Sequence, residues 1–235
     1  MLVAMGRSRK KPAGWRATHD RWALYEQAVQ QPMVTLGLIE DLAEDWMDFE
    51  PTVLREDFSG SAQLSGLWVA SDAGRHALAI DHDVAALDYA ELHHRKPLGP
   101  AGKRLQLKCT DVMKIHRPLA DVIVSLNFSH FIFHDRAGLL RYLKHARKVL
   151  RPGGMILLDS FGGSAGMQPS TDERPFASFT YLWEQGPIDP VTHRFVSHIH
   201  FRMAHGRMIR RAFTYDWRHW SVAALIRSEE HTSEL

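Results

Sequence analysis

The feature that most constrains the fold of this chain is an alternation of short apolar segments with helical segments between residues 53 and 158. The segment 121–126, Asp-Val-Ile-Val-Ser-Leu, is almost continuously apolar. Such a run is typical of a strand that is buried on both faces of a parallel sheet. Strands that alternate with helices at this spacing favour a doubly wound sheet, because parallel neighbours need a crossover connection. We therefore expect an α/β fold with a mostly parallel sheet.

The pattern assigns most of the chain to elements of this fold. Asp135 is a suitable N-cap for a helix at 136–150, and the Arg-Pro-Gly-Gly run at 151–154 is expected to end that helix. The first helix has Thr18 or Asp20 as its candidate cap. The expected strands are 53–56, 77–80, 105–108, 121–126 and 155–158, and the expected helices are 18–30, 35–48, 62–71, 84–93 and 136–150.

A different pattern follows residue 166. Residues 167–178 are polar and rich in turn-forming residues, whereas 179–184, 194–203 and 207–217 are expected strands. The turn at 204–207 is expected to close a hairpin. Alternation predicts a small antiparallel β cover over the parallel sheet, with one strand face made by Phe195, Ser197, Ile199, Phe201 and Met203.

The chain divides into four expected parts. Residues 1–50 hold a basic tail and the N-terminal helices, with the tail expected to be a solvated arm. Residues 51–165 form the parallel-sheet domain, and 166–226 form the antiparallel cover and the start of a last helix. Residues 227–235 resemble the translation of a sequencing-library adaptor, so we expect them to be an artefact and the natural protein to continue past residue 226.

Composition excludes several classes of protein. No segment approaches the roughly 20 apolar residues that a membrane span needs, and the apolar start is too short for a signal peptide. Cys109 is the single cysteine, which fits a reducing cytoplasm. His198 and His200 share an expected strand face near His205, but no cysteine or acid completes a ligand set, so we expect no metal site.

Polar residues follow four of the expected strands, where an open α/β sheet binds its ligands. The first strand leads into the tight turn Asp57-Phe58-Ser59-Gly60-Ser61, whose backbone N–H groups can meet a polar ligand group. Asp81 ends the second strand, where a carboxylate can accept hydrogen bonds from a ribose diol. Asp111 ends the third strand, where it can accept from the amine of adenine, and residues 127–130 form a polar cluster after the fourth. Capping a helix is the alternative role for Asp81, and capping a turn for Asp111.

With these residues the chain resembles the class I S-adenosylmethionine-dependent methyltransferases over residues 20–165. The matching pieces are 56–61, 80–83, 110–112, 127–129 and 150–154. The resemblance implies a Rossmann-like methyltransferase fold and S-adenosylmethionine as the cofactor. It implies that the first loop holds the methionine portion, Asp81 the ribose and Asp111 the adenine. The implied cofactor contacts are Asp57, Phe58, Ser59, Gly60, Asp81, His82, Asp111, Val112, Asn127 and Phe128.

The resemblance implies less about the acceptor. Methyl transfer is an in-line displacement that needs a base only if the nucleophile arrives protonated, so no catalytic residue is assigned. Ser129 and His130 are candidates near the expected methyl position, with a packed histidine as the alternative for His130. The cover is similar to that of small-molecule N-methyltransferases, which favours a small molecule over nucleic acid. Candidate substrate contacts are Tyr25, Arg211, Tyr215 and Trp217, with a core position as the alternative for Tyr25 and a solvated strand face for Arg210 and Arg211.

The chain also departs from the family pattern. Phe58 and Ala62 replace the first and third glycines of the usual Gly-x-Gly-x-Gly loop. Phenylalanine is poorly suited to positive φ, so we expect this loop to turn differently. The family's last helix and two closing strands are missing, which fits the expected truncation. Two alternatives remain: a nicotinamide-dependent oxidoreductase, whose glycine fingerprint is absent, and a non-catalytic methyltransferase-like binding protein. The sequence does not identify the acceptor or the oligomeric state.

Overall fold

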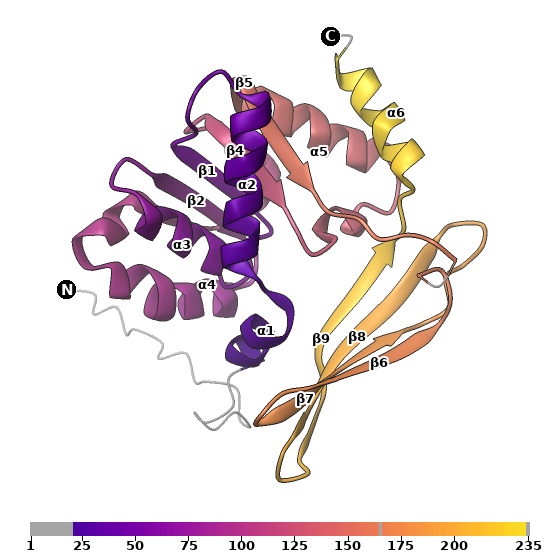
Figure 1. The fold of residues 1–235 in the computed structure, drawn as a ribbon. Helices are drawn as coiled ribbons and strands as arrows, with labels where there is room; N and C mark the ends of the chain where they lie inside the picture. Colours follow the sequence, from indigo (N-terminus) through magenta and orange to yellow (C-terminus); the bar gives the residue numbers. More distant parts are fainter. Residues whose placement is uncertain (1–20, 165, 234–235) are drawn as a thin grey trace, which may run out of the picture.

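A five-stranded parallel sheet forms the body of the protein, in a computed structural model that describes residues 21–164 and 166–233 (Figure 1). The strand order is β3-β2-β1-β4-β5. The order reverses between β1 and β4, so a crevice opens beyond the carboxyl ends of these two strands. The strands are β1 (Val53–Asp57), β2 (His76–Asp81), β3 (Leu105–Cys109), β4 (Ala120–Ser125) and β5 (Leu150–Leu158).

Helices cover both faces of this sheet, as the doubly wound pattern predicts. Helices α2 (Pro32–Trp46) and α3 (Gln63–Ser71) share a core with one face, and α5 (Arg136–Val149) packs on the other. Side chains alternate between the two faces along each strand. In β4, Val122 and Val124 therefore face α2 and α3, whereas Ile123 faces α5. Helix α4 (Val84–Ala90) continues as a π-helix (Glu91–Arg95) and a 3₁₀ segment (Lys96–Arg104) that leads into β3.

A second sheet of four antiparallel strands lies beside the carboxyl edge of the first (Figure 1). Helix α1 (Arg21–Val29) packs against it through Trp22 and Tyr25, whose rings meet Phe213 at centroid distances of 5.0 and 4.9 Å. This helix thereby joins the small sheet to the body. The strands are β6 (Ser170–Pro175), β7 (Phe179–Gln185), β8 (Arg194–Met203) and β9 (Met208–Arg218), and α6 (Val222–Ser233) follows them.

The sheet, its order of elements and the antiparallel cover are confirmed, and three expected boundaries are wrong. The polar segment 167–178 contains the strand β6, which is exposed along its length and so carries no apolar pattern. The run 151–154 lies within β5, which begins at Leu150 with a register shift against β4. The helix expected at 84–93 changes to a π-helix at Glu91.

The C-terminal part of the described chain is a helix. Helix α6 does begin where a last helix was expected, and it runs on through part of the segment set aside as an artefact. The basic tail and the candidate caps Thr18 and Asp20 lie outside the described residues. Within the described ranges, no helix is both long and apolar enough to cross a membrane.

Asp135 caps α5 as predicted, because its carboxylate accepts a hydrogen bond from the Gly138 amide at 2.7 Å. We expect Asp135→Ala to lower the free energy of unfolding by about 1 kcal/mol, since the first turn of α5 loses an amide partner. Urea denaturation measures the change. Asp45→Ala, an exposed position within α2, is the matched control and is expected to change stability by less than about 0.5 kcal/mol. Equal effects of the two substitutions would contradict the capping role.

Candidate functional site

Three adjoining cavities lie where the carboxyl edge of the parallel sheet meets α1 and the small sheet. The central cavity, of 510 Å³, is lined by the ends of β1, β2 and β4 and by β9. The loop cavity, of 420 Å³, lies between the turns after β1 and β3. The aromatic cavity, of 310 Å³, lies against the inner face of the small sheet. The central and loop cavities share Phe58, Asp81, His82 and Ile132, and the central and aromatic cavities share Tyr25, Asn127, Tyr215 and Trp217.

Asp81 lies at the boundary between the central and loop cavities. Its carboxylate accepts hydrogen bonds from the backbone N–H groups of Gly60 and Asp83, each at 2.8 Å. The first bond ties the loop after β1 to the end of β2. Helix α4 is capped by Asp83, whose side chain accepts from the Ala85 amide, so the alternative role of Asp81 as a helix cap is filled by another residue.

The loop after β1 keeps one glycine of the usual pattern and takes positive φ at three positions. Phe58, Gly60 and Ala62 have φ values of 58°, 54° and 55°. The expectation of a different turn rested on phenylalanine avoiding positive φ, and Phe58 does not avoid it. A non-glycine residue at positive φ costs on the order of 1–2 kcal/mol. Ring packing offsets this cost, because the Phe58 ring contacts Tyr142 and Phe133 at centroid distances of 5.7 and 6.2 Å.

A buried guanidinium links the loop after β1 to the segment after β3. Arg55 is fully buried, and its Nε donates to the Asp57 carboxylate at 2.7 Å. Its two terminal nitrogens donate to the carbonyls of Val112 and Ile115, in the segment after β3. The other Asp57 oxygen accepts from the Tyr142 hydroxyl at 3.1 Å. Asp57 lines the central cavity, but its carboxylate is thus committed to internal partners.

Glu56 is a site residue that the sequence reasoning missed. It lines the central cavity, and one of its oxygens accepts from the hydroxyl and amide of Ser65, at 2.5 and 3.1 Å. Burial raises the pKa of Glu56 to about 7, although the hydrogen bonds from Ser65 lower it. Alternation along β1 could have revealed Glu56, because it places this side chain on the opposite face of the sheet from Asp57.

Asp111 and Val112, two of the expected cofactor contacts, both line the loop cavity. The Asp111 carboxylate accepts from the Met113 amide at 2.8 Å and so also caps the following turn. Gly60, Asp81 and Asp111 therefore lie along one continuous rim, where Gly60 belongs to the central cavity, Asp111 to the loop cavity and Asp81 to both.

The turn after β4 depends on an acid that the sequence reasoning also missed. Asn127 and Phe128 have φ values of 54° and 60°, and their backbone N–H groups donate to the two oxygens of Asp159 at 2.8 and 2.9 Å. Asp159 follows β5, and burial raises the pKa of its carboxyl. Ser129 lines the central cavity, but its hydroxyl donates to the Leu126 carbonyl.

His130 is not brought into the site. Its side chain is fully buried, it lines none of the three cavities, and neither ring nitrogen has a hydrogen-bond partner in the described part of the chain. Burial, followed by the nearby His219, lowers the pKa of His130 to about 4. It is therefore a neutral, packed histidine at pH 7.

The predicted substrate contacts all reach the cavities. Burial raises the pKa of Tyr25 and of Tyr215, and each of these side chains influences the pKa of the other. Trp217 stacks on Tyr215 at a centroid distance of 4.3 Å. Arg211 lines the central cavity and remains exposed, with a φ of 49° at a strand irregularity. Tyr25 is thus both a core residue and a wall of the site.

Comparisons with known proteins agree with this geometry. Residues 59–158 match the sequence profile of the methyltransferase domain family. The malonyl-[acyl-carrier protein] O-methyltransferase of Methylococcus capsulatus is 32% identical over 104 residues, which are 44% of this chain and 35% of that protein. The chain therefore matches only about a third of the length of this curated relative.

Solved structures extend the likeness of the fold over most of the chain. An S-adenosylmethionine-dependent methyltransferase from Clostridium acetobutylicum has a TM-score of 0.69 at 17% identity, covering 90% of this chain and 85% of its own. An amino pentose methyltransferase from Micromonospora echinaspora, solved with S-adenosylmethionine, has a TM-score of 0.68 at 11% identity, covering 93% and 90%. At these identities the structures show the fold alone.

Residues 59–158 thus match the methyltransferase domain family, and the fold is the Rossmann-like fold of S-adenosylmethionine-dependent methyltransferases. This similarity favours a methyltransferase over the nicotinamide-dependent alternative. The argument for a non-catalytic protein rested on Phe58 and Ala62 in place of glycines, and both residues take positive φ.

The raised pKa of Glu56 predicts a pH-dependent stability. The folded protein holds this proton up to about pH 7, whereas the unfolded chain releases it near pH 4.5, so Glu56 weakens the folded state progressively between these values. We expect the stability of Glu56→Gln relative to the parent protein to rise by up to about 3 kcal/mol from pH 4.5 to pH 7. Urea denaturation across this range measures it, and a constant difference would contradict the raised pKa.

The Arg55 network predicts a non-additive pair of substitutions. Arg55→Met leaves the Asp57 carboxylate buried without its cation and is expected to lower the free energy of unfolding by about 3–5 kcal/mol. Adding Asp57→Leu removes that unpaired charge, so the double variant is expected to be more stable than Arg55→Met alone. Chemical denaturation of the two single variants and the double variant completes the cycle. Additive losses would show that the two side chains do not act as a pair.

Proposed function

We propose that this protein uses S-adenosylmethionine to methylate a small molecule, with the cofactor along the rim formed by Gly60, Asp81 and Asp111. The observation that carries the proposal is the position of Asp81, the acid that both the central and the loop cavity share. A ligand that spans the two cavities must pass this carboxylate, as the ribose of an adenosyl group would. The ribose hydroxyls would donate to the acceptor positions that Gly60 and Asp83 leave unused.

The charges of the central cavity support this assignment. Glu56 and Asp81 both line it, and the cofactor would bring an ammonium group and a sulfonium to it. We infer that Glu56 faces the methionine end, where an approaching ammonium would favour the ionised form of this buried carboxyl. Arg21 pairs with Asp83 at 2.8 Å, so this cation on the rim is already neutralised.

The loop cavity supports a position for the adenine. Its walls combine the apolar side chains of Val112, Met113 and Phe133 with the Asp111 carboxylate. We infer that the base would pack on the apolar side chains and that Asp111 would accept from its exocyclic amine. The Arg55 guanidinium would fix this segment relative to the loop after β1, because it bonds to both.

The bound cofactor would supply a methyl group on a sulfonium. A nucleophile on the acceptor would attack the methyl carbon and displace the thioether. The protein's part is then to place the acceptor in line and to exclude water. His130 is not a candidate base, because it lies outside the cavities. We infer that Ser129 shapes the turn beneath the methyl position and does not take part in proton transfer, because its hydroxyl already donates to Leu126.

A small-molecule acceptor is supported by the aromatic cavity, which at 310 Å³ lies at the lower end of the range for small-molecule sites. The proteins named above have different acceptors, malonyl-[acyl-carrier protein] in one case and an amino pentose in the other. These acceptors differ in kind, so the support for a small molecule comes from the cavity itself.

Isothermal titration with S-adenosylhomocysteine tests the proposal. We expect micromolar binding to the full chain and none for NAD. Asp81→Asn is expected to weaken binding about 10- to 100-fold, because a charged acceptor for the ribose is lost. Asp45→Asn removes the same charge from the exposed side of α2 and is the matched control, with unchanged affinity expected. No binding by the folded protein, or binding of NAD in its place, would contradict the proposed function.

A further inference from the structure

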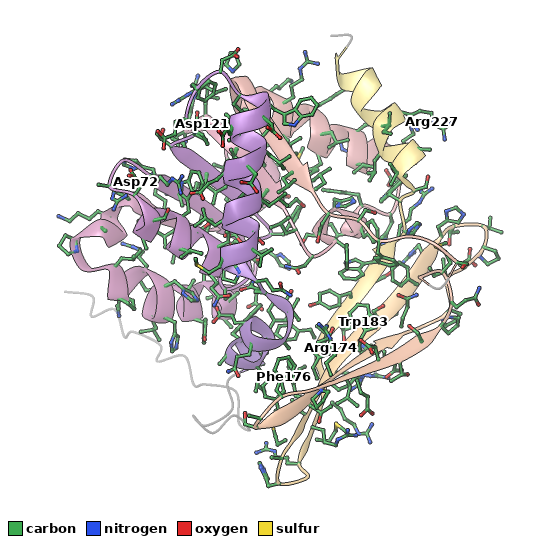
Figure 2. The ribbon with its side chains drawn as sticks, viewed as in Figure 1. Asp72, Asp121, Arg174, Phe176, Trp183 and Arg227 are labelled. Carbon is green, nitrogen blue, oxygen red and sulfur yellow. The ribbon has the colours of Figure 1, made fainter. Side chains whose placement is uncertain are left out.

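Three rings line the aromatic cavity on the side of the small sheet, Trp183 on β7 and Tyr215 and Trp217 on β9. Tyr215 and Trp217 stack on each other at a centroid distance of 4.3 Å, and Trp183 is tilted against them at 6.2 and 6.0 Å. Figure 2 labels Trp183 and Arg174 on this sheet. Trp183 and Tyr215 remain partly exposed, whereas Trp217 is buried. The exposed parts of Trp183 and Tyr215 offer a surface against which a flat ring can pack.

The polar groups of the same cavity are partly engaged with one another. Its polar side chains, besides the tyrosine hydroxyls, are Asn127, Asp172 and Arg174. The Arg174 guanidinium lies 3.8 Å from the Asp172 carboxylate and over the Tyr181 ring at 4.5 Å.

The Asn127 side-chain amide is a further polar group of the wall, and it makes no hydrogen bond to another of the described residues. The hydroxyl groups of a polyhydroxylated ligand would have to compete with the contact between Asp172 and Arg174 or stay without hydrogen bonds, which is costly. An aromatic ligand with one polar atom would not.

Among the described residues, the walls of this cavity hold no histidine, and the one carboxylate among them, Asp172, lies beside Arg174. Burial raises the pKa values of Tyr25, Tyr181 and Tyr215, so these hydroxyls stay protonated at neutral pH. The walls therefore suit a nucleophile that is already neutral and carries a lone pair, such as an aromatic amine, whereas a phenol must first lose its proton.

We propose that the aromatic cavity binds the methyl acceptor and that this acceptor is an aromatic amine. Its ring packs against Trp183 and Tyr215, and its nitrogen lies near Asn127, which lines both the aromatic and the central cavity. The proposal rests on the methyl-transfer function proposed above. The nitrogen lone pair forms the new bond to the methyl carbon of the sulfonium donor, the C–S pair of electrons stays on sulfur as a thioether, and the nitrogen then releases its proton to water.

Three probes, each titrated into the complex of the protein with S-adenosylhomocysteine, test the class of acceptor. 6-Aminoquinoline presents an aromatic amine, 6-hydroxyquinoline the matched phenol, and glucosamine a polyhydroxylated amine. Isothermal titration is expected to show both quinolines binding at least about 10-fold more tightly than glucosamine. With S-adenosylmethionine at pH 7, 6-aminoquinoline is expected to be methylated at least about 10-fold faster than 6-hydroxyquinoline. Glucosamine as the better ligand, faster transfer to the phenol, or no binding of either quinoline would each overturn the proposal.

Matched tryptophan substitutions locate the binding site. Trp183 lines the aromatic cavity and neither of the other two cavities. Trp183→Leu is therefore expected to weaken 6-aminoquinoline binding about 3- to 10-fold and to leave S-adenosylhomocysteine binding unchanged. Trp183→Phe keeps a ring and is expected to restore most of the affinity. Trp46→Leu, at a residue of α2 that is 79% exposed, is the control. Unchanged amine binding in Trp183→Leu would place the acceptor elsewhere, whereas absent cofactor-product binding in the parent protein would refute the proposed function itself.

Discussion

The buried guanidinium of Arg55 is the interaction on which the rest of the site depends. It lies within β1 and bonds to Asp57, which begins the loop lining the central cavity, and to the carbonyls of Val112 and Ile115, which follow β3. One cation thus fixes the two loops at the opposite ends of the rim. A buried charge is costly to desolvate, and here the carboxylate and two carbonyls offset that cost. The arrangement also lets Phe58 turn at positive φ, because the Tyr142 hydroxyl that bonds to Asp57 belongs to the ring on which Phe58 packs.

The central, loop and aromatic cavities adjoin one another and differ in the groups that line them. The loop and central cavities meet at Asp81, and the central and aromatic cavities meet at Asn127 and the tyrosine pair. The parallel sheet supplies charged and backbone groups to the first two, whereas the small sheet supplies aromatic rings to the third. Helix α1 joins the two sheets, since Arg21 reaches Asp83 on the body and Trp22 packs on Phe213 of β9. A donor and an acceptor can therefore meet where the two sheets face each other.

Sequence alone predicted those features that have a local physical cause. The apolar period of β4, the alternation of β8 and the cap at Asp135 are set by neighbouring residues, and each is confirmed. The strand β6 was missed because it is exposed on both faces and carries no apolar period. Arg55 and Asp159 were missed because their roles depend on partners far away in the chain, such as Val112 for Arg55 and Asn127 for Asp159. Glu56, whose partner Ser65 is nearby in the chain, could have been found from the alternation along β1. The burial of His130 could not be predicted locally, since only tertiary packing decides which side of the turn faces the cavity.

The central claim is that one ligand spans the central and loop cavities with its ribose on Asp81. A crystal structure of the complex with S-adenosylhomocysteine tests this most directly. The account predicts that the ribose hydroxyls lie within hydrogen-bond distance of the Asp81 carboxylate, the adenine beside Asp111 and the methionine end beside Glu56. Density for the ligand at any other place, or an adenine directed toward the small sheet and away from Asp111, would contradict it.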